Sequence, residues 1–366
     1  MAGEKYMRLA LELAEKGCGH VSPNPMVGAV IVKDGRIIGS GYHRRYGDLH
    51  AEREALKACS ESPDGADMYV TLEPCCHHGH QPPCTEAIID AGIKRVVIGS
   101  SDPNPLVAGK GVRILKDHGI YVTEGFMKDE CDDINKVFFH YITTGRPYVV
   151  MKYAMTMDGK IAAFTGKSKW ITAETARKRV HEDRNRYSAI MTGLGTVMRD
   201  DPLLNCRMEG GKDPVRVICD TDLRIPTTSQ IVRTAGRYRT VIATASDDGY
   251  RTAELEKAGC EILHVGRKDG HTNLSELTEK LGRMKIDSVL LEGGGTLNWS
   301  ALRAGIVNKV QAYVAPKILG GKDAPSPVGG EGAASPDAGV MLSKPKITVL
   351  GDDILLESEV TRCLPE

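Results

Sequence analysis

Three residues of the kinds that bind zinc lie in the first quarter of the chain: His50, Cys75 and Cys84. Zinc prefers nitrogen and sulfur ligands, and three of them leave a fourth position for water. Glu52 follows His50 by two residues, where its carboxylate can stand beside the metal and carry a proton. The pattern predicts hydrolytic chemistry, with three zinc ligands and Glu52 as the catalytic residue.

The order of these residues matches the known signature of zinc deaminases, His-x-Glu followed by Pro-Cys and a second cysteine. That signature has two residues between its cysteines, whereas eight separate Cys75 from Cys84. The insertion holds further potential ligands, namely Cys76, His77, His78 and His80. A closed zinc site without chemistry is the alternative, but such a site has no use for a glutamate two residues from its histidine.

A second group of residues is typical of nucleotide binding. Glycine-rich turns at residues 193–196 and 292–296 each follow an apolar strand pattern. Such a turn lets backbone N–H groups and the start of a helix approach a phosphate. Glycine turns are common and the Rossmann spacing is absent, so two purely structural turns remain the alternative.

Strands and helices hold these residues in place. In the first 145 residues, the spacing of apolar residues predicts strands that alternate with helices. An Asp34–Gly35 pair predicts a tight hairpin between the first two strands. His50 and Cys84 lie where helices begin, and the helix dipole there favours a thiolate. We expect strands at 27–32, 36–41, 68–72, 95–99 and 120–123, and helices at 4–16, 50–59, 84–91 and 109–118.

A domain boundary is expected at residues 143–147, where Gly145 and Pro147 precede a new apolar strand. We therefore expect two α/β domains, at residues 1–145 and 146–366. In the second, we expect strands at 148–153, 189–192, 215–219, 240–243, 262–265, 288–291 and 310–315, and helices at 172–186, 251–257, 273–284 and 296–304. Residues 324–339 predict a surface loop, and residues 347–350 and 354–360 predict a closing hairpin.

Composition excludes several classes of function. The chain has 366 residues, and its 48 Lys+Arg balance 48 Asp+Glu, which argues against a dedicated nucleic-acid binder. No apolar run approaches the ~20 residues that a membrane-spanning helix needs. The N-terminal segment is amphipathic and charged, unlike a signal peptide. We expect a cytoplasmic protein in which the ten cysteines are reduced.

The motifs together resemble the bifunctional deaminase–reductase family of riboflavin biosynthesis, over about residues 5–360. The stretches that carry the resemblance are 23–28, 50–52, 71–84, 102–111, 152–160, 168–172, 200–207, 220–221 and 292–300. Cys76 stands where the family commonly has serine, which argues against it as a ligand. The resemblance implies an N-terminal cytidine-deaminase-like mixed sheet with flanking helices and a C-terminal dihydrofolate-reductase-like α/β domain.

The resemblance also implies two reactions on one small molecule, a diaminopyrimidinone that carries a ribosylamino 5′-phosphate. A zinc-dependent hydrolysis would release ammonia, and NADPH would then reduce the ribosyl group to a ribityl chain. The residues implied for NADPH are Ala154, Trp170, Thr196, Asp200, Thr221, Gly294, Gly295, Thr296, Leu297, Asn298, Trp299 and Ser300. Those implied for the substrate are Asn24, Ser168, Arg184, Leu204, Arg207 and Glu292.

Simpler roles remain open for single residues. Asn24 between two prolines can be a turn former, Trp170 can pack in a core, and Arg184 or Arg207 can form a surface ion pair. Binding of the ribose phosphate is a physically reasonable role for the two arginines, since a guanidinium binds phosphate with two parallel hydrogen bonds.

Two other functions are also considered. One is a single-function zinc deaminase of a free base or RNA with a second domain that only binds a nucleotide. The other is a non-catalytic zinc-bearing nucleotide sensor. Zero net charge and the motifs of the second domain disfavour the first, and Glu52 disfavours the second. We expect a homo-oligomeric enzyme with no nucleic-acid or membrane partner.

Overall fold

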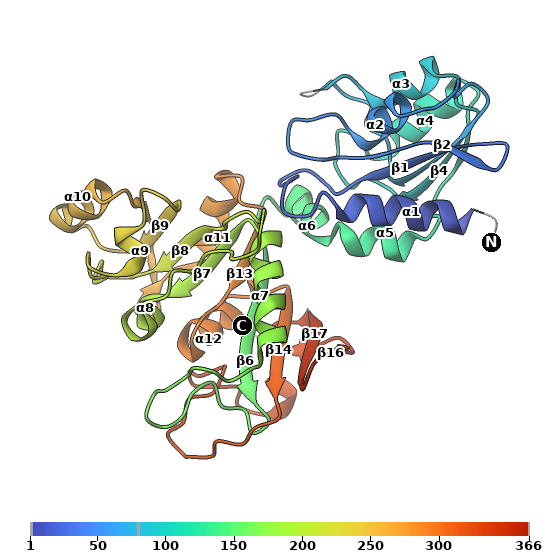
Figure 1. Cartoon of the computed structure of the whole chain (residues 1–366). Coiled ribbons are helices and arrows are strands. Elements are labelled where there is room, and N and C mark those ends of the chain that lie inside the picture. Colours follow the sequence, from blue (N-terminus) through green and yellow to red (C-terminus); the bar gives the residue numbers. More distant parts are fainter. Residues whose placement is uncertain (1–2, 79–80, 365–366) are drawn as a thin grey trace. The chain divides into compact units, whose positions relative to one another are not determined.

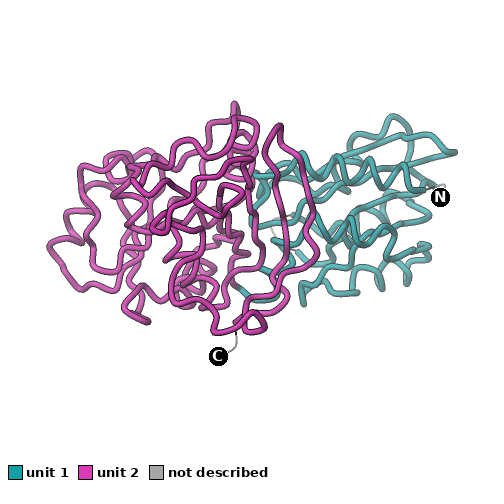
Figure 2. The backbone as a smooth tube through the Cα atoms, turned by 90° about the horizontal axis from the view of Figure 1, so that it is seen from below, with its two compact units in different colours: residues 1–145 teal, residues 146–366 magenta. Residues whose placement is uncertain are grey.

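The computed structural model describes residues 3–78 and 81–364. The chain divides into two compact units, Met1–Gly145 and Arg146–Glu366 (Figure 2). Each unit is a sheet covered by helices on both faces, so both have the predicted α/β class. None of the helices in the described ranges is long and apolar enough to cross a membrane.

The first unit has a five-stranded mixed sheet in the order β2-β1-β3-β4-β5. Strand β1 runs antiparallel to β2 and β3, and β3, β4 and β5 are parallel. The strands are β1 (Gly28–Lys33), β2 (Arg36–Tyr42), β3 (Asp67–Leu72), β4 (Arg95–Ser100) and β5 (Tyr121–Thr123). The helices are α1 (Glu4–Glu15), α2 (Ala51–Lys57), α3 (Cys84–Asp90), α4 (Lys110–Asp117), α5 (Lys128–Ile134) and α6 (Lys136–Thr144).

Alternation along the strands of this sheet divides the core into two layers. Ile31 and Val70 pack with residues of α2, α3 and α4 on one face, while Val30 and Tyr69 pack with α1 and α5 on the other (Figure 1). The predicted hairpin is confirmed: Asp34 and Gly35 have φ values of 50° and 75° between β1 and β2, as a tight two-residue turn requires.

The second unit has a ten-stranded sheet in the order β10-β9-β8-β7-β13-β6-β14-β17-β15, with β16 paired to β17. The strands from β10 to β14 in this order are parallel, and β17 closes the sheet antiparallel. They are β6 (Tyr148–Thr156), β7 (Ala189–Gly193), β8 (Val215–Cys219), β9 (Thr240–Thr244), β10 (Glu261–His264), β13 (Ser288–Leu291), β14 (Lys309–Ala315), β15 (Met341–Leu342), β16 (Lys346–Leu350) and β17 (Asp353–Arg362).

Helices cover both faces of this larger sheet. Val217 and Val241 pack in the layer that holds α11 and α12, whereas their neighbours Ile218 and Ile242 pack with α9 and α10. The helices are α7 (Glu174–Arg186), α8 (Leu194–Asp200), α9 (Gln230–Arg233), α10 (Gly249–Lys257), α11 (Leu274–Arg283) and α12 (Gly295–Arg303). Because parallel strands end at the same edge, the turns after β8, β7 and β13 meet there.

The structure adds short elements that the apolar pattern did not predict. These are α5, α6, α8, α9, β15 and a two-stranded hairpin of β11 (Arg267–Lys268) and β12 (His271–Thr272). Of these, α8, α9, β15 and the hairpin are too short to show a period. The predicted loop at 324–339 contains one 3₁₀ turn, Pro336–Ala338. The predicted closing hairpin is confirmed as β16 and β17.

Candidate active sites

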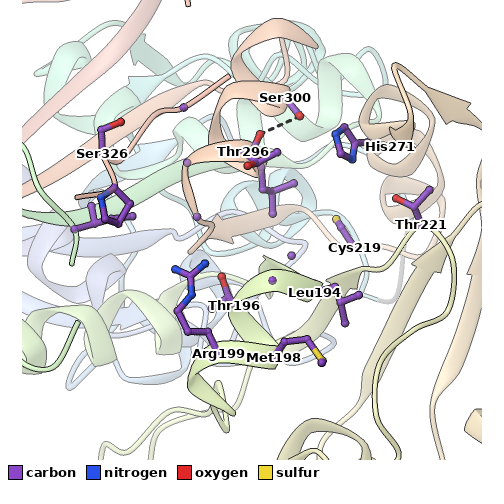
Figure 3. Close-up of a pocket in the computed structure, with 18 of the residues that line it drawn as sticks. Leu194, Thr196, Met198, Arg199, Cys219, Thr221, His271, Thr296, Ser300 and Ser326 are labelled. Carbon is purple, nitrogen blue, oxygen red and sulfur yellow. Dashed lines mark hydrogen bonds between the residues drawn. The ribbon is translucent and has the colours of Figure 1, made fainter. Parts of the chain in front are cut away.

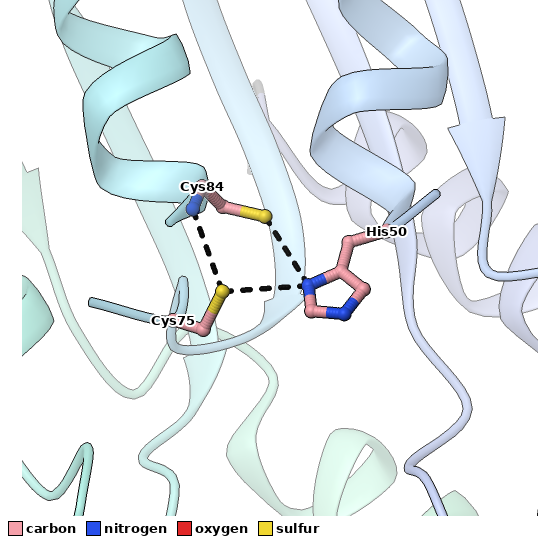
Figure 4. Close-up of side chains that lie close together, drawn as sticks. All are labelled: His50, Cys75 and Cys84. Atoms are coloured by element: carbon pink, nitrogen blue, oxygen red, sulfur yellow. Dashed lines mark hydrogen bonds between the residues drawn. The ribbon is translucent and has the colours of Figure 1, made fainter. Parts of the chain in front are cut away.

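A cluster of two thiols and one imidazole lies in the first unit (Figure 4). His50 Nδ1 is 3.4 Å from Cys75 Sγ and 3.4 Å from Cys84 Sγ, and the three ligand atoms lie within 4.8 Å of one another. His50 is the residue before α2, Cys75 lies in the loop after β3, and Cys84 begins α3. Three segments distant in the sequence thus converge on one point.

The chemistry of this donor set fits zinc. Hydrogen bonds from the Cys84 thiol and from His50 outweigh burial and lower the pKa of Cys75 to about 4. The Cys84 N–H also donates to Cys75 Sγ, at 3.4 Å. The site therefore favours a thiolate, which is the form that binds metal. Two thiols and an imidazole leave one tetrahedral position of the ion for a further ligand.

The other described candidates of the insertion, Cys76, His77 and His78, are not part of this cluster. Cys76 Sγ contacts the backbone oxygen of Leu106 at 3.8 Å, and burial raises the pKa of this thiol. His78 is exposed, with its ring 3.7 Å from Glu86. His77 lines the neighbouring cavity, and His80 lies outside the described residues.

Glu52 is buried in the first turn of α2, with 3% of its surface exposed. It lines a cavity of about 200 Å³ together with His50, Cys75 and Asn24. Burial raises the pKa of Glu52 above its usual range. A carboxyl group with a raised pKa can both accept and return a proton near neutral pH, so its position suits a proton carrier.

His43 fixes the orientation of Asn24, and sequence reasoning missed it because an isolated histidine carries no motif. His43 Nδ1 lies 3.0 Å from the oxygen of Leu49, which can only accept, so this ring nitrogen carries the proton. The other nitrogen, Nε2, then accepts from Asn24 Nδ2 at 3.2 Å. Burial lowers the pKa of His43, which favours this neutral form. The Asn24 amide oxygen is thereby presented as an acceptor.

Two carboxyl groups beside the cavity were also missed. Glu73 accepts backbone N–H bonds from Asp102, Gly109 and Val112, at 3.1 to 3.4 Å, and so holds the loop before α4. Asp102 lines the cavity, and burial raises its pKa to about 6. Their stretches carried the family resemblance, but no local pattern predicted that Glu73 would tie this loop to the zinc-ligand loop.

The second unit has a pocket of about 850 Å³ at the carboxyl edge of its sheet (Figure 3). The turns after β8, β7 and β13 line it, together with residues 322–326 and Gly329. The residues assigned to NADPH in the sequence that line this pocket are Thr196, Thr221, Gly294, Gly295, Thr296, Leu297 and Ser300. The volume is suited to a dinucleotide.

Local details of this pocket fit NADPH. Gly294 precedes α12 without a side-chain cap, so the N–H groups of the first turn can bind an anionic group placed in the pocket. A Cβ on Gly295 would stand 2.9 Å from the oxygen of Ser326, so only glycine fits. The Oδ1 atom of Asp220 is buried without a hydrogen-bond partner in this pocket, where it can accept from a ligand hydroxyl or amine.

The other residues assigned to NADPH do not line this pocket. Ala154 is in β6 and Asp200 ends α8. Trp170 is 62% exposed under the guanidinium of Arg177, at 4.5 Å, so it does not pack in the core. Asn298 is buried and donates to the oxygen of Pro327, and Trp299 lies against Gly330, so both support the loop that closes the pocket.

A buried ion cluster lies between the ends of β13 and β6. Arg184 donates two hydrogen bonds to Glu292, at 2.8 and 3.0 Å, and Lys152 Nζ is 3.5 Å from the same carboxylate. Burial opposes ionisation of Glu292, but the two cations lower its pKa to about 2. Arg184 also donates to the oxygen of Asn205. A surface ion pair for Arg184 is therefore ruled out.

The remaining substrate candidates lie in loops. Leu204 is buried and has a φ of 53°. The backbone oxygen of the residue before it, Leu203, accepts a hydrogen bond from the buried Arg216. Arg207 is exposed, and it lies close enough to His181 to lower the pKa of that histidine together with burial and Arg184. Ser168 is half-buried in the loop before Trp170.

Comparison with known proteins gives both units a family. The cytidine and deoxycytidylate deaminase zinc-binding region matches residues 2–100, and the RibD C-terminal domain matches residues 147–356. The riboflavin biosynthesis protein RibD of Actinobacillus pleuropneumoniae is 54% identical over 96% of this chain and 94% of its own length. That of Bacillus amyloliquefaciens is 42% identical over 96% and 95%.

Solved structures agree with these relatives over nearly the whole chain. RibD of Acinetobacter baumannii superimposes with a TM-score of 0.88 at 37% identity, covering 99% of both chains. A diaminohydroxyphosphoribosylaminopyrimidine deaminase/5-amino-6-(5-phosphoribosylamino)uracil reductase of Thermotoga maritima superimposes with a TM-score of 0.84 at 39% identity, covering 98% of this chain and 99% of its own. The chain thus belongs to the RibD family, the bifunctional deaminase–reductases of riboflavin biosynthesis that use zinc and NADPH.

Proposed function

We propose that this enzyme deaminates a diaminopyrimidinone ribosylamino 5′-phosphate in unit 1 and reduces the ribosyl group of the product in unit 2. The observation that carries the proposal is the convergence of His50, Cys75 and Cys84 on a cavity that also holds Glu52. The separate pocket of unit 2, with the ion cluster of Glu292 nearby in the sheet order, supports the second half.

In the first reaction, His50, Cys75 and Cys84 would hold zinc, which when bound activates water for attack on a ring carbon that bears an amine. Glu52 takes a proton from that water and gives it to the departing amine, so ammonia leaves and oxygen replaces nitrogen on the ring. The Asn24 amide oxygen accepts from the ring, because His43 holds the amide in that direction.

In the second reaction, NADPH would lie in the pocket of unit 2 and supply a hydride to the ribose C1′. The protein contributes alignment of the two reactants. Glu292 is locked in place by Arg184 and can accept from ribose hydroxyls, while the exposed guanidinium of Arg207 is suited to the 5′-phosphate. The C1′–O4′ bond breaks to give an open-chain imine before the hydride adds to C1′, and O4′ takes up a proton from solvent, so that a ribityl chain results.

Two assays on one preparation test this proposal. The zinc-loaded chain is given the diaminopyrimidinone phosphate with and without NADPH, and both ammonia and the absorbance of NADPH are followed. Ammonia release without NADPH, and NADPH oxidation that depends on substrate, are expected. A single-function deaminase would release ammonia and leave NADPH unchanged, which would contradict the second half. A homo-oligomer in the cytoplasm remains a prediction, and light scattering of the purified chain tests the oligomer.

A further inference from the structure

The order of the strands indicates which end of the unit 2 pocket lies far from the proposed site of hydride transfer. Along the sheet, β8, β7, β13 and β6 are successive neighbours. Lys152 on β6 and Glu292 after β13 mark the substrate side. Thr221 follows β8, which is two strands away from β13. A cofactor that delivers hydride at the β13–β6 side must extend its other half toward the end of β8.

The middle of the pocket is suited to the pyrophosphate of a dinucleotide. The glycine-rich turns after β7 and β13 lie between the two ends, and α12 begins there with N–H groups that no side chain caps. In Figure 3, Thr196 and Thr296 lie between Ser326 on one side and Thr221 with His271 on the other. The adenosine half therefore belongs beside Thr221 and His271.

Arg224 lines this adenosine end, and the backbone that presents it is fixed. The flanking residues Leu223 and Ile225 are buried, while Arg224 itself is exposed. Arg251 donates to the oxygen of Leu223 at 3.1 Å and to that of Ile225 at 2.5 Å. The Ile225 N–H donates to Asp220 Oδ2 at 2.7 Å. These hydrogen bonds fix the backbone on both sides of Arg224, so the exposed side chain starts from a defined position.

Neighbouring charges leave this arginine available for an anion. Asp222 is held by Arg267 at 2.5 Å, whereas Arg224 Nε is 3.8 Å from the same carboxylate. His271 lines the same end of the pocket, and its neighbour Thr272 is tied to Thr221 by two hydrogen bonds, at 3.1 and 3.2 Å. The loop after β8 and the β11–β12 hairpin thus bring Arg224 and His271 to the same end of the pocket.

We propose that Arg224, with His271 beside it, binds the 2′-phosphate of NADPH and thereby selects NADPH over NADH. The proposal rests on the proposed nucleotide site. A phosphate on the adenosine ribose is what distinguishes the two cofactors, and a guanidinium binds phosphate with two parallel hydrogen bonds. The pocket has two rival cations: Arg199 lies on α8 beside Thr196, near the pyrophosphate, and Lys322 comes from the loop after β14, on the substrate side.

Calorimetric binding of two adenosine fragments to the full chain tests the proposal without turnover. The probes are 2′,5′-ADP and 5′-AMP, which differ only in the phosphate in question. The wild-type chain should bind 2′,5′-ADP more tightly. Arg224→Gln should weaken 2′,5′-ADP by about tenfold or more, as for loss of one charge-assisted hydrogen bond, and leave 5′-AMP nearly unchanged. His271→Gln should weaken 2′,5′-ADP by a smaller factor.

Two further arginine variants are the matched controls. Arg233→Gln removes the same charge from an exposed position on α9 outside the pocket, and it should change neither binding constant. Arg199→Gln tests the rival cation. If Arg224→Gln keeps the full preference for 2′,5′-ADP, or if Arg199→Gln alone abolishes it, the assignment to Arg224 is wrong while the nucleotide site stands. If the wild-type chain binds neither fragment nor NADPH, the proposed nucleotide site itself fails.

Discussion

The two candidate sites of this protein are built in opposite ways. In unit 1, side chains supply the functional groups: one imidazole, two thiols and a buried carboxyl group lie at a cavity of about 200 Å³. In unit 2, two glycine-rich turns and the uncapped start of α12 contribute backbone N–H groups to a pocket of about 850 Å³. A metal ion requires particular ligand atoms at short range, whereas a long phosphorylated cofactor requires space and many backbone donors.

This difference has a consequence for mutation. Removing one side chain from the zinc cluster deletes a ligand that nothing else replaces, whereas the backbone donors of the nucleotide pocket persist when a side chain changes. We therefore expect single substitutions to have larger effects in unit 1.

Loss of a zinc ligand should have the largest effect. Cys75→Ala or Cys84→Ala should lower zinc content and abolish ammonia release, because two remaining ligands hold the ion poorly. NADPH oxidation with already deaminated substrate should continue, since the nucleotide pocket lies in the other unit. Metal analysis and the two assays measure this, with Cys76→Ala as the matched control. Equal zinc loss from Cys76→Ala would show that the wrong thiol was assigned.

Glu52→Gln should keep zinc but lose about 10²–10⁴-fold in the rate of ammonia release, because the amide cannot accept the proton. The change is nearly isosteric, so the buried first turn of α2 should keep its structure. Metal content and steady-state ammonia production are measured together. Glu54→Gln on the same helix is the control and should behave as wild type. A normal rate for Glu52→Gln would remove it from the mechanism.

Glu292→Gln should slow reduction and destabilise unit 2 by about 3–5 kcal/mol, since it leaves Arg184 and Lys152 as buried charges without their partner. Ammonia release by unit 1 should persist when the assay is run at a temperature at which unit 2 of the variant is still folded. Calorimetric unfolding and the two assays measure the effect. A variant with unchanged unfolding temperature would show that this ion cluster contributes nothing to the fold.

The same cluster predicts an acid dependence of stability. The folded pKa of Glu292 is about 2, below its usual value of about 4.3 in an unfolded chain. The unfolded state therefore takes up the proton first as pH falls, so this stabilising contribution is complete above about pH 5 and is lost toward pH 2. Unfolding of the wild type by denaturant from pH 6 to 3 measures the slope. Glu292→Gln should show a smaller slope over that range.

Arg207→Ala should have the smallest of these effects, a weakening of reduction by about tenfold to hundredfold through loss of one phosphate contact. The exposed position should leave folding unchanged. KM for the deaminated substrate should rise, and ammonia release should stay at the wild-type rate. Lys212→Ala, an exposed cation nearby in the sequence, is the control. If ammonia release falls in parallel with reduction, Arg207 does not act in unit 2 alone.

Features that depend only on neighbouring residues could be predicted from the amino-acid sequence. Asp34–Gly35 specified a tight turn because both residues tolerate positive φ. The His50-x-Glu52 and Pro74-Cys75 motifs marked the cluster that we propose binds zinc, because metal ligation requires specific residue types near the ends of elements. Periodicity located the longer helices and strands, since a repeating apolar face is a local property.

The tertiary structure alone decided which distant residues meet. Arg184 and Glu292 are 108 positions apart, and both can form ion pairs with many partners, so nothing local predicted their contact. The pairing of β1 with β2 brings His43 to Asn24, and the order of β8, β7 and β13 brings Arg224 into the same pocket as the two glycine-rich turns. Strand order and register follow from the packing of the whole core, which no short stretch of sequence encodes.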